Sequence, residues 1–220
     1  MRKPENLRTI AKNLAKKFSH ISRVWDGKSA ILEMRNSGSS HWKQMEWIGF
    51  YFEYLCNKML ARASDIPGPR YGRTGFDSFK TIPWDFKAHA INTSAHTIIV
   101  NDTEAIMKAI RQYGSVGVIL ALGEVEYNDK KRTFQKWHGK LKGGMSAYEK
   151  ARIERGAWSR LRKTSFNLKQ ILFLVLTKES LQKTGSFQSS FRNSNGRPRR
   201  KKVLIDLEKL QKEIVHTIEF

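Results

Sequence analysis

The 220-residue sequence contains a single cysteine and no long apolar run. Cys56 alone excludes a disulfide framework within the chain and a cysteine-rich metal site. No stretch approaches the roughly 18 apolar residues that a membrane-spanning helix needs, and no secretory signal is recognisable. We therefore expect a cytoplasmic protein from a reducing compartment, without a membrane partner.

Acidic residues are also scarce. The 41 lysines and arginines outnumber the 20 aspartates and glutamates, which gives a formal net charge of +21. Such an excess favours a polyanionic partner, because each phosphate contact releases counterions and strengthens binding. A membrane surface is anionic too, but the basic residues are spread along the whole chain and no spanning segment accompanies them. Nucleic acid is the expected partner.

Several motifs of common enzyme classes are missing. No glycine-rich loop has the spacing of a P-loop, and no histidine pair has the H-E-x-x-H spacing of a zinc site. No serine has the sequence context of a nucleophile elbow. We therefore expect neither a P-loop NTPase nor a serine hydrolase.

What is present suits one folded domain. A chain of 220 residues with 40% hydrophobic content can form a packed core, so we treat 1–220 as a single domain. The segment 22–34 is ambiguous, with a short extended part. Periodicity predicts helices at 4–18, 41–62, 104–113, 146–163 and 207–216, and strands at 84–91, 97–101, 116–122, 171–176 and 203–206. This order of elements predicts an α/β fold with a mixed central sheet flanked by helices.

The first of these strands has an unusual polar face. Its residues alternate strictly, so that Asp85, Lys87 and His89 lie on one face and apolar residues on the other. Upstream, Asp77 ends the sequence TGFD, and the intervening SFKTIP suits a turn. We expect a hairpin that brings Asp77 alongside Asp85 and Lys87. The alternative is that these charges lie on the solvated face of a half-buried strand.

The helix predicted before this hairpin carries two glutamates at the edge of its apolar face. Glu46 and Glu53 lie two turns apart, with Gly49 almost midway. A glycine inside a helix costs about 1 kcal/mol relative to alanine, so we expect another backbone to approach closely at Gly49. Glu53 is then placed to reach over the hairpin as a third carboxylate. The alternative is a solvated helix glutamate, which we favour for Glu46.

The helix and the hairpin together form a motif. The helix contains G-x-x-F-E-x-L and the hairpin contains D…D-x-K. This pattern resembles the PD-(D/E)XK nuclease superfamily, in particular its MutH/MvaI-like branch, which includes small type II restriction endonucleases. Phe76 stands where the family often has proline, and Asp85 where it more often has glutamate. The residues that match are Gly49, Phe52, Glu53, Leu55, Asp77, Asp85 and Lys87.

The resemblance implies a restriction-endonuclease-like core with Mg²⁺ as the cofactor. Asp77, Asp85 and the backbone carbonyl of Phe86 would hold the ion, because Mg²⁺ prefers hard oxygen ligands. Glu53 would complete the shell, hold a second ion or orient a water molecule. Lys87 would position the attacking water and stabilise the charge that develops on the phosphate. The expected catalytic set is therefore Asp77, Asp85, Lys87 and Glu53.

Two basic segments are candidate DNA-binding elements. In 125–145, basic residues interleave with aromatic ones after a possible hairpin turn at Asn128-Asp129. Aromatic side chains among cations can stack on bases, so Lys136, Trp137 and Lys140 are expected to contact DNA. The alternative is an exposed hairpin whose aromatic residues fold onto the body.

The second segment, 185–202, is polar and ends in a run of arginines and lysines. Arginine suits guanine edges in the major groove and asparagine suits adenine, so this is the candidate recognition loop. The alternative is a segment that grips phosphates without reading sequence. His89 is a further candidate for a DNA contact, with a structural hydrogen bond as its alternative. The candidate residues of the loop are Arg192, Asn193, Asn195, Arg197, Arg199 and Arg200.

Three hypotheses follow from these observations. The favoured one is a Mg²⁺-dependent type II restriction endonuclease that cuts double-stranded DNA at a short specific site, as a homodimer because two strands must be cut. The second is a junction resolvase or a nicking repair nuclease on the same core. The third is a non-catalytic DNA- or RNA-binding protein in which the charged cluster has no chemical role.

Overall fold

The fold is described from a computed structural model, which places residues 6–127, 130–145, 147–157, 160–188 and 200–220. Its main sheet has the order β1-β8-β7-β5-β4, with β11 also paired to β8. Strands β5 and β7 are parallel, and the other pairs are antiparallel. The sheet is therefore mixed, as expected. Its strands are β1 (Val24–Asp26), β4 (Ser78–Lys80), β5 (Ile82–Ala90), β7 (Val116–Glu126), β8 (Ser165–Leu176) and β11 (Ile214–Glu219).

Two smaller sheets lie beside it. One has the order β6-β10-β9 and is antiparallel throughout, and the other is the hairpin β2-β3. Helix α4 (Thr103–Tyr113) directly follows β6, and α7 (Lys178–Thr184) directly precedes β9. The strands are β2 (Arg70–Tyr71), β3 (Thr74–Gly75), β6 (Thr97–Asp102), β9 (Gly185–Gln188) and β10 (Lys202–Asp206).

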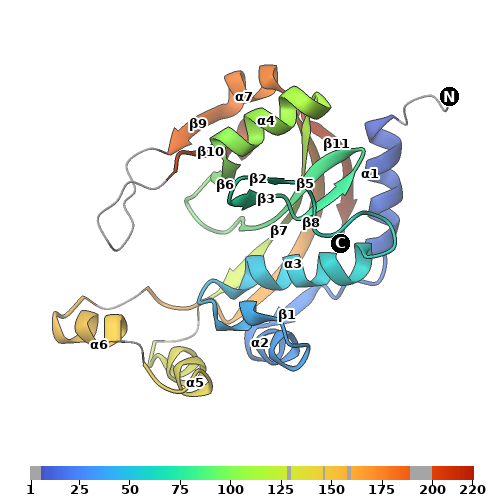
Figure 1. Cartoon of the computed structure of the whole chain (residues 1–220). Helices are drawn as coiled ribbons and strands as arrows, with labels where there is room; N and C mark the ends of the chain where they lie inside the picture. The colour runs from blue at the N-terminus through green and yellow to red at the C-terminus, as the bar shows by residue number, and fades with distance from the viewer. Residues whose placement is uncertain (1–5, 128–129, 146, 158–159, 189–199) are drawn as a thin grey trace.

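The main sheet separates two apolar clusters. Helices α1 (Leu7–Ala15), α2 (Gly27–Asn36) and α3 (Trp47–Leu60) pack on the face that carries Trp84 and Phe86. Helix α4 and the β6-β10 pair pack on the other face. Figure 1 shows α4 and α7 at the top of the view and α2 and α3 toward the bottom, with β5, β7 and β8 between them. The predicted α/β fold with a mixed sheet flanked by helices is confirmed.

Strand β5 owes its place in this sheet to alternation. Trp84 and Phe86 are buried in the first cluster, and Asp85 between them faces the other side of the sheet. Trp84 lies opposite Gly117 of β7. A Cβ atom at position 117 would overlap the Trp84 ring, so this glycine makes room for the indole. The polar face of β5 is therefore set by how its apolar face packs.

Several sequence-based boundaries are wrong. The helix expected at 41–62 begins at Trp47, after a separate 3-10 turn at Ser40–Lys43. The segment 22–34, which was ambiguous, has its short extended part in β1 and then contains most of α2, because the Asp26 side chain caps the helix by accepting a hydrogen bond from the Ser29 amide. Helix α6 (Ala147–Glu154) is shorter than the expected 146–163.

The chain end differs most from expectation. A helix was expected at 207–216, but only Leu207–Lys209 form a 3-10 turn and β11 follows at Ile214–Glu219. This strand pairs with β8. Pairing along an open sheet edge outweighs a weak helical pattern. The segment 185–202 was expected to be a loop, but its first four residues form β9 and its last residue begins β10.

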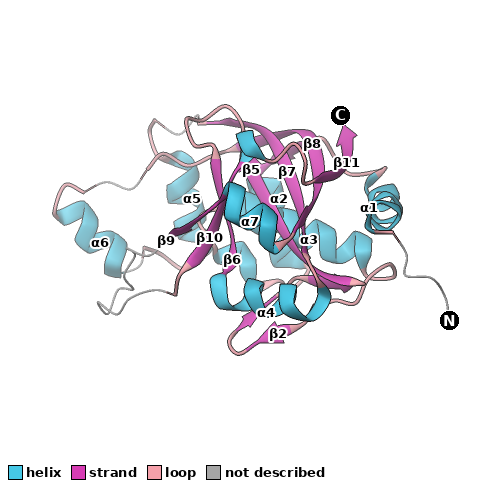
Figure 2. Ribbon diagram, turned by 90° about the horizontal axis from the view of Figure 1, so that it is seen from above, coloured by secondary structure: helices cyan, strands magenta, loops and turns pink. Residues whose placement is uncertain are grey.

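Between β7 and β8, residues 133–141 form a helix where a hairpin was expected, and α6 lies within the helix expected at 146–163. Helix α5 (Thr133–Leu141) is anchored by buried Phe134 and His138, which recur at helical spacing. Figures 1 and 2 both show α5 and α6 projecting from the same side of the body. None of the helices in the described part of the chain combines the length and apolar character of a bilayer-crossing segment.

We expect Gly117→Ala to lower the free energy of unfolding by about 1–3 kcal/mol, because the added methyl group overlaps fully buried Trp84. Gly49→Ala is the matched control. No described atom lies within 4 Å of a Cβ at Gly49, so alanine should stabilise α3 by up to about 1 kcal/mol. Urea unfolding followed by circular dichroism measures both. Equal effects of the two substitutions would contradict the packing described for β5.

Candidate active site

A tight hairpin holds the first predicted carboxylate against β5. Strands β4 and β5 are joined at Thr81, whose φ is 63°, and Ser78 pairs with Trp84. One residue earlier, the Asp77 amide donates to the Trp84 carbonyl at 3.0 Å. The Asp77 Oδ2 atom accepts a hydrogen bond from the Phe86 amide at 2.6 Å. The predicted hairpin is confirmed, and it fixes Asp77 through both its backbone and its side chain.

The other side of Asp77 is supported by the loop after α3. The Gly68 amide donates to the Phe76 carbonyl at 3.1 Å and lies 3.3 Å from the Asp77 carbonyl. A Cβ atom on Gly68 would overlap the Ser78 carbonyl, so only glycine allows this close approach. The Asp77 backbone is thus held between β5 and this loop.

Asp85 is the most deeply buried member of the group. It is 1% exposed, and its Oδ1 atom accepts a hydrogen bond from the Asn101 amide at 3.1 Å. Within the described residues no donor bonds to Oδ2, and the Lys87 Nζ atom lies 3.8 Å away from it. Burial raises the pKa of Asp85 to about 7, and the charge of Asp77 adds to this effect against Lys87 and Asn101. The alternative of a solvated strand face is wrong for this residue.

Lys87 remains a cation in this setting. Its Nζ atom donates to the Phe86 carbonyl at 3.2 Å, and its side chain is 27% exposed. Burial alone would lower the pKa of Lys87, but the carboxylates of Asp85, Asp77 and Glu53 together outweigh it and raise the pKa above its usual value. A permanently charged ammonium cannot serve as a general base. It can donate hydrogen bonds and stabilise negative charge.

Glu53 approaches the same cluster from α3. Its pKa is raised to about 7 by burial first and then by the charge of Asp77, with Lys87 opposing. The His41 Nδ1 atom lies 3.8 Å from its Oε1 atom. Glu46, by contrast, lies near Arg162 and Lys163 at 3.9 and 3.7 Å, on the surface. The expectation that another backbone approaches Gly49 closely is wrong. Apart from the backbone of α3 itself, no described atom lies within 4 Å of a Cβ atom built at this position.

These groups suit a cation that keeps part of its water shell. Among the described residues, no three His, Cys, Asp or Glu side chains gather closely enough to enclose a metal ion. Mg²⁺ needs only one or two protein carboxylates, since water and substrate phosphate complete its octahedron. The buried Asp85 Oδ2 atom, which lacks a hydrogen bond, fits that role beside Asp77. The Phe86 carbonyl accepts one hydrogen bond from Lys87 and has a second lone pair, which can serve as a further oxygen ligand.

Asn101 was missed by sequence reasoning. It lies at the end of β6 and reaches Asp85 from a different sheet. The pair Asn101-Asp102 closes the strand β6, and Asp102 caps the helix α4 that follows. Lys202 of β10, opposite Asp102 in the register, adds a positive charge that lowers the pKa of Asp85. The only sequence signal for Asn101 was its position as a polar residue at a strand end. This position indicates a contact with Asp85 only once the packing of the two sheets is known.

The candidate recognition loop is described only at its two ends, 185–188 and 200–202. Arg192, Asn193, Asn195, Arg197 and Arg199 lie outside the described residues. The Arg200 Nη1 atom donates to the Thr74 hydroxyl at 3.3 Å and lies 3.9 Å from the Asp102 Oδ2 atom. The end of the basic segment is therefore anchored at the same strand end that carries Asn101.

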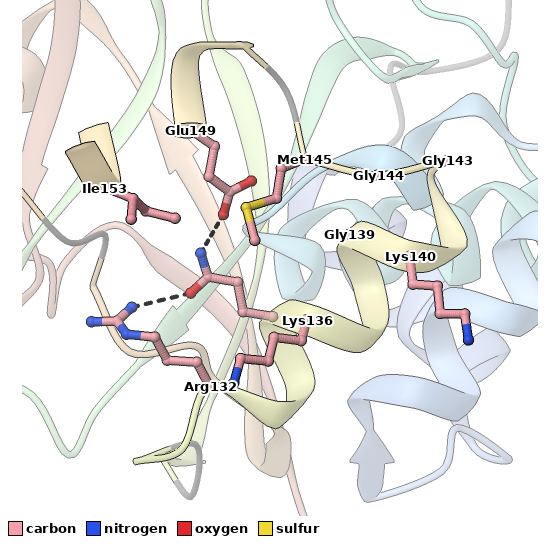
Figure 3. A pocket seen from close by; sticks show the side chains of 10 residues that line it. Arg132, Lys136, Gly139, Lys140, Gly143, Gly144, Met145, Glu149 and Ile153 are labelled. Carbon is pink, nitrogen blue, oxygen red and sulfur yellow. Dashed lines mark hydrogen bonds between the residues drawn. The ribbon is translucent and has the colours of Figure 1, made fainter. Parts of the chain in front are cut away.

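The other DNA-binding candidates lie on α5. Lys136 and Lys140 are exposed and line a hollow of about 410 Å³ between α5 and α6 (Figure 3). Gln135 bonds to both Arg132 and Glu149 across this hollow. Trp137 packs on Phe134, with ring centroids 5.6 Å apart, and joins the first apolar cluster. This is the alternative in which the aromatic residue folds onto the body. Asn128 and Asp129 lie outside the described residues.

His89 forms a local contact. Its Nε2 atom lies 2.8 Å from the Ala95 carbonyl. Burial lowers the pKa of His89, which keeps the ring neutral near pH 7. This is the structural hydrogen bond that was the alternative to a DNA contact.

Comparison with known proteins adds little to this picture. No protein-family model matches the chain, and no curated protein matches it. A crystal structure of the restriction endonuclease BglI bound to its DNA recognition sequence is similar with a TM-score of 0.39 and 11% identity. The match covers 97% of this chain and 86% of that chain. With so low an identity, the chemistry of the site has to be inferred from the residues of this chain.

Proposed function

We propose that this protein is a Mg²⁺-dependent endonuclease that hydrolyses phosphodiester bonds of double-stranded DNA, of the type II restriction class. The observation that carries the proposal is the buried Asp85 carboxylate, with one oxygen lacking a hydrogen bond beside Asp77 and Lys87. A net charge of +21 supports DNA as the substrate. Carboxylates can hold the metal ion, and a lysine can stabilise the negative charge, in metal-dependent phosphodiester hydrolysis.

Each residue of the cluster has a distinct role in this proposal. Asp77, Asp85 and the Phe86 carbonyl would hold the ion, which when bound would polarise the phosphate and activate a water molecule. Lys87 donates hydrogen bonds to the attacking water and to a phosphate oxygen, where negative charge accumulates. Glu53, whose pKa is about 7, is matched to orient the water and accept its proton near neutral pH.

The assembly follows from the substrate. Two active sites cut both strands of a duplex in one binding event, so we propose a homodimer, which sedimentation with a DNA duplex tests. A junction resolvase or a nicking nuclease would use the same cluster but would give nicked or branched products. Discrete fragments that persist after long digestion of a plasmid favour the restriction class over both.

We expect Asp85→Asn and Lys87→Ala to lower the rate of plasmid cleavage in Mg²⁺ by about 10³-fold or more, because both remove charge at the reacting phosphate. Asp206→Asn is the matched control, since Asp206 is an ion-paired aspartate of β10 in contact with Lys209. DNA affinity measured in Ca²⁺ should stay within a few-fold for all three. If the wild type cuts no DNA with any divalent ion, the proposed function is wrong.

We expect the apparent affinity for Mg²⁺ to increase as the pH rises from about 6 to about 8. Burial raises the pKa of both Asp85 and Glu53 to about 7, so below this value protons compete with the ion for these carboxyl groups. The Mg²⁺ concentration for half-maximal cleavage, measured at each pH, tests this. Glu53→Gln should reduce the slope by removing one titrating group. A Mg²⁺ requirement that is constant over this range would contradict the expectation.

We expect the double substitution of Lys136 and Lys140 by glutamine to weaken DNA binding for all sequences alike. The slope of log affinity against log salt should fall by about 2, because two phosphate contacts are lost. The matched control is Lys12 of α1 and Lys16, which directly follows this helix; the two lysines are exposed, have the same spacing and lie at the other side of the molecule (Figure 1). Fluorescence anisotropy at several salt concentrations measures both. Equal salt slopes for the two double variants would exclude α5 as a DNA contact.

A further inference from the structure

The Asn101 side chain makes hydrogen bonds to three separate parts of the chain. Its Nδ2 group donates to the Asp85 Oδ1 atom at 3.1 Å and to the Gly75 carbonyl at 3.1 Å. Its Oδ1 atom accepts from the Asp102 amide at 2.8 Å. Both N–H bonds of the amide are therefore used. Turning the amide over would place its oxygen against a carboxylate and a carbonyl, so only one orientation satisfies all partners.

This orientation decides which oxygen of Asp85 remains available. Because Asn101 bonds to Oδ1, the oxygen without a hydrogen bond is Oδ2, which is the one nearest to Lys87. The same amide also bonds to Gly75, two residues before Asp77. Asn101 thus links the two carboxylate-bearing segments, although it belongs to the second sheet.

The strand that carries Asn101 is itself firmly held. Lys202 pairs with Asp102, and both the Thr103 amide and the Thr103 hydroxyl donate to the Lys201 carbonyl, at 3.0 and 3.1 Å. Asp102 also caps α4 by accepting the Glu104 amide. An amide on such a rigid element can hold a carboxylate rotamer, which a mobile loop residue cannot do.

We propose that Asn101 is a positioning residue that holds the Asp85 carboxylate in the rotamer that binds the divalent ion. The inference rests on the proposed function. Without the Asn101 amide, the Asp85 carboxylate turns toward the Lys87 ammonium and forms a closer ion pair with it. That ion pair competes with the cation, so metal affinity falls although neither metal-binding carboxylate has been removed.

Direct binding of Mn²⁺ to the full-length protein, followed by electron paramagnetic resonance, tests the proposal. Asn101→Ala should raise the Mn²⁺ dissociation constant by about 10- to 100-fold, as expected for loss of a residue that orients a ligand. The Mg²⁺ concentration for half-maximal plasmid cleavage should rise in parallel, while DNA affinity in Ca²⁺ stays unchanged. Asp85→Asn serves as the reference in which Mn²⁺ binding at this site is lost.

Asn92→Ala is the matched control. Asn92 is also a bridging asparagine, but it donates to the Val125 carbonyl at 2.9 Å and accepts from the Val125 amide at 3.0 Å, with no carboxylate involved. Its Mn²⁺ affinity should equal that of the wild type. If Asn101→Ala does not fold, Asn101→Leu keeps the side-chain volume without the hydrogen bonds and provides the same comparison.

The outcomes separate this inference from the proposed function. A wild type that cuts DNA, with an Asn101 variant of equal Mn²⁺ affinity, overturns the inference and leaves the function standing. A wild type that binds Mn²⁺ but cuts no DNA contradicts the function, and the Mn²⁺ comparison still decides the role of Asn101. A wild type that binds no Mn²⁺ overturns both.

Discussion

Burial of the Asp85 carboxylate is the constraint on which the rest of the structure depends. Removing a carboxylate from water costs several kcal/mol unless charges and hydrogen bonds compensate for it. Here Lys87 and Asn101 compensate in part, yet burial still raises the pKa of Asp85 to about 7. The remaining penalty has to be offset by a proton or by another cation. A buried carboxylate of this kind is held in place by its surroundings, at a cost to the stability of the protein.

Asp85 is buried because of the way in which both faces of β5 are packed. Trp84 and Phe86 anchor β5 in the apolar cluster beneath α1, α2 and α3, and this fixes the side on which Asp85 and Lys87 emerge. A shift of register by one residue would exchange the two sets, and the core packing forbids it. The charge of Lys87 acts on Glu53 as well as on Asp85, although Glu53 belongs to α3 on the apolar side of the sheet. The charged cluster and the hydrophobic core are therefore specified by the same few residues.

Local sequence patterns predicted the parts of the site that depend on local geometry. Strict alternation predicted β5 and the common face of Asp85 and Lys87, and the short turn sequence predicted that Asp77 returns to the same strand. Asn101 could not be predicted, because its meaning depends on two sheets meeting across residues far apart in the chain. The helix expected at 207–216 is replaced by a 3-10 turn and the start of β11 for a similar reason, since the free edge of β8 selects a strand from Ile214 onward. Helix α5 was mistaken for a hairpin because its anchors, Phe134 and His138, reveal their helical spacing only once their burial is known.

The pairing of β7 with β8 continues as far as Glu126 and Ser165, and the Thr164 amide donates to the Glu126 carbonyl at 2.9 Å. The chain between them thus leaves and rejoins the sheet at adjacent points. Because the sheet already holds its two ends together, doubling the length of such a connection adds only about 0.6 kcal/mol of closure entropy. The connection between β7 and β8 can therefore be lengthened, shortened or replaced while both strands keep their register. Diversity among descendants of this chain should accumulate there first, and the charged strand should stay as it is.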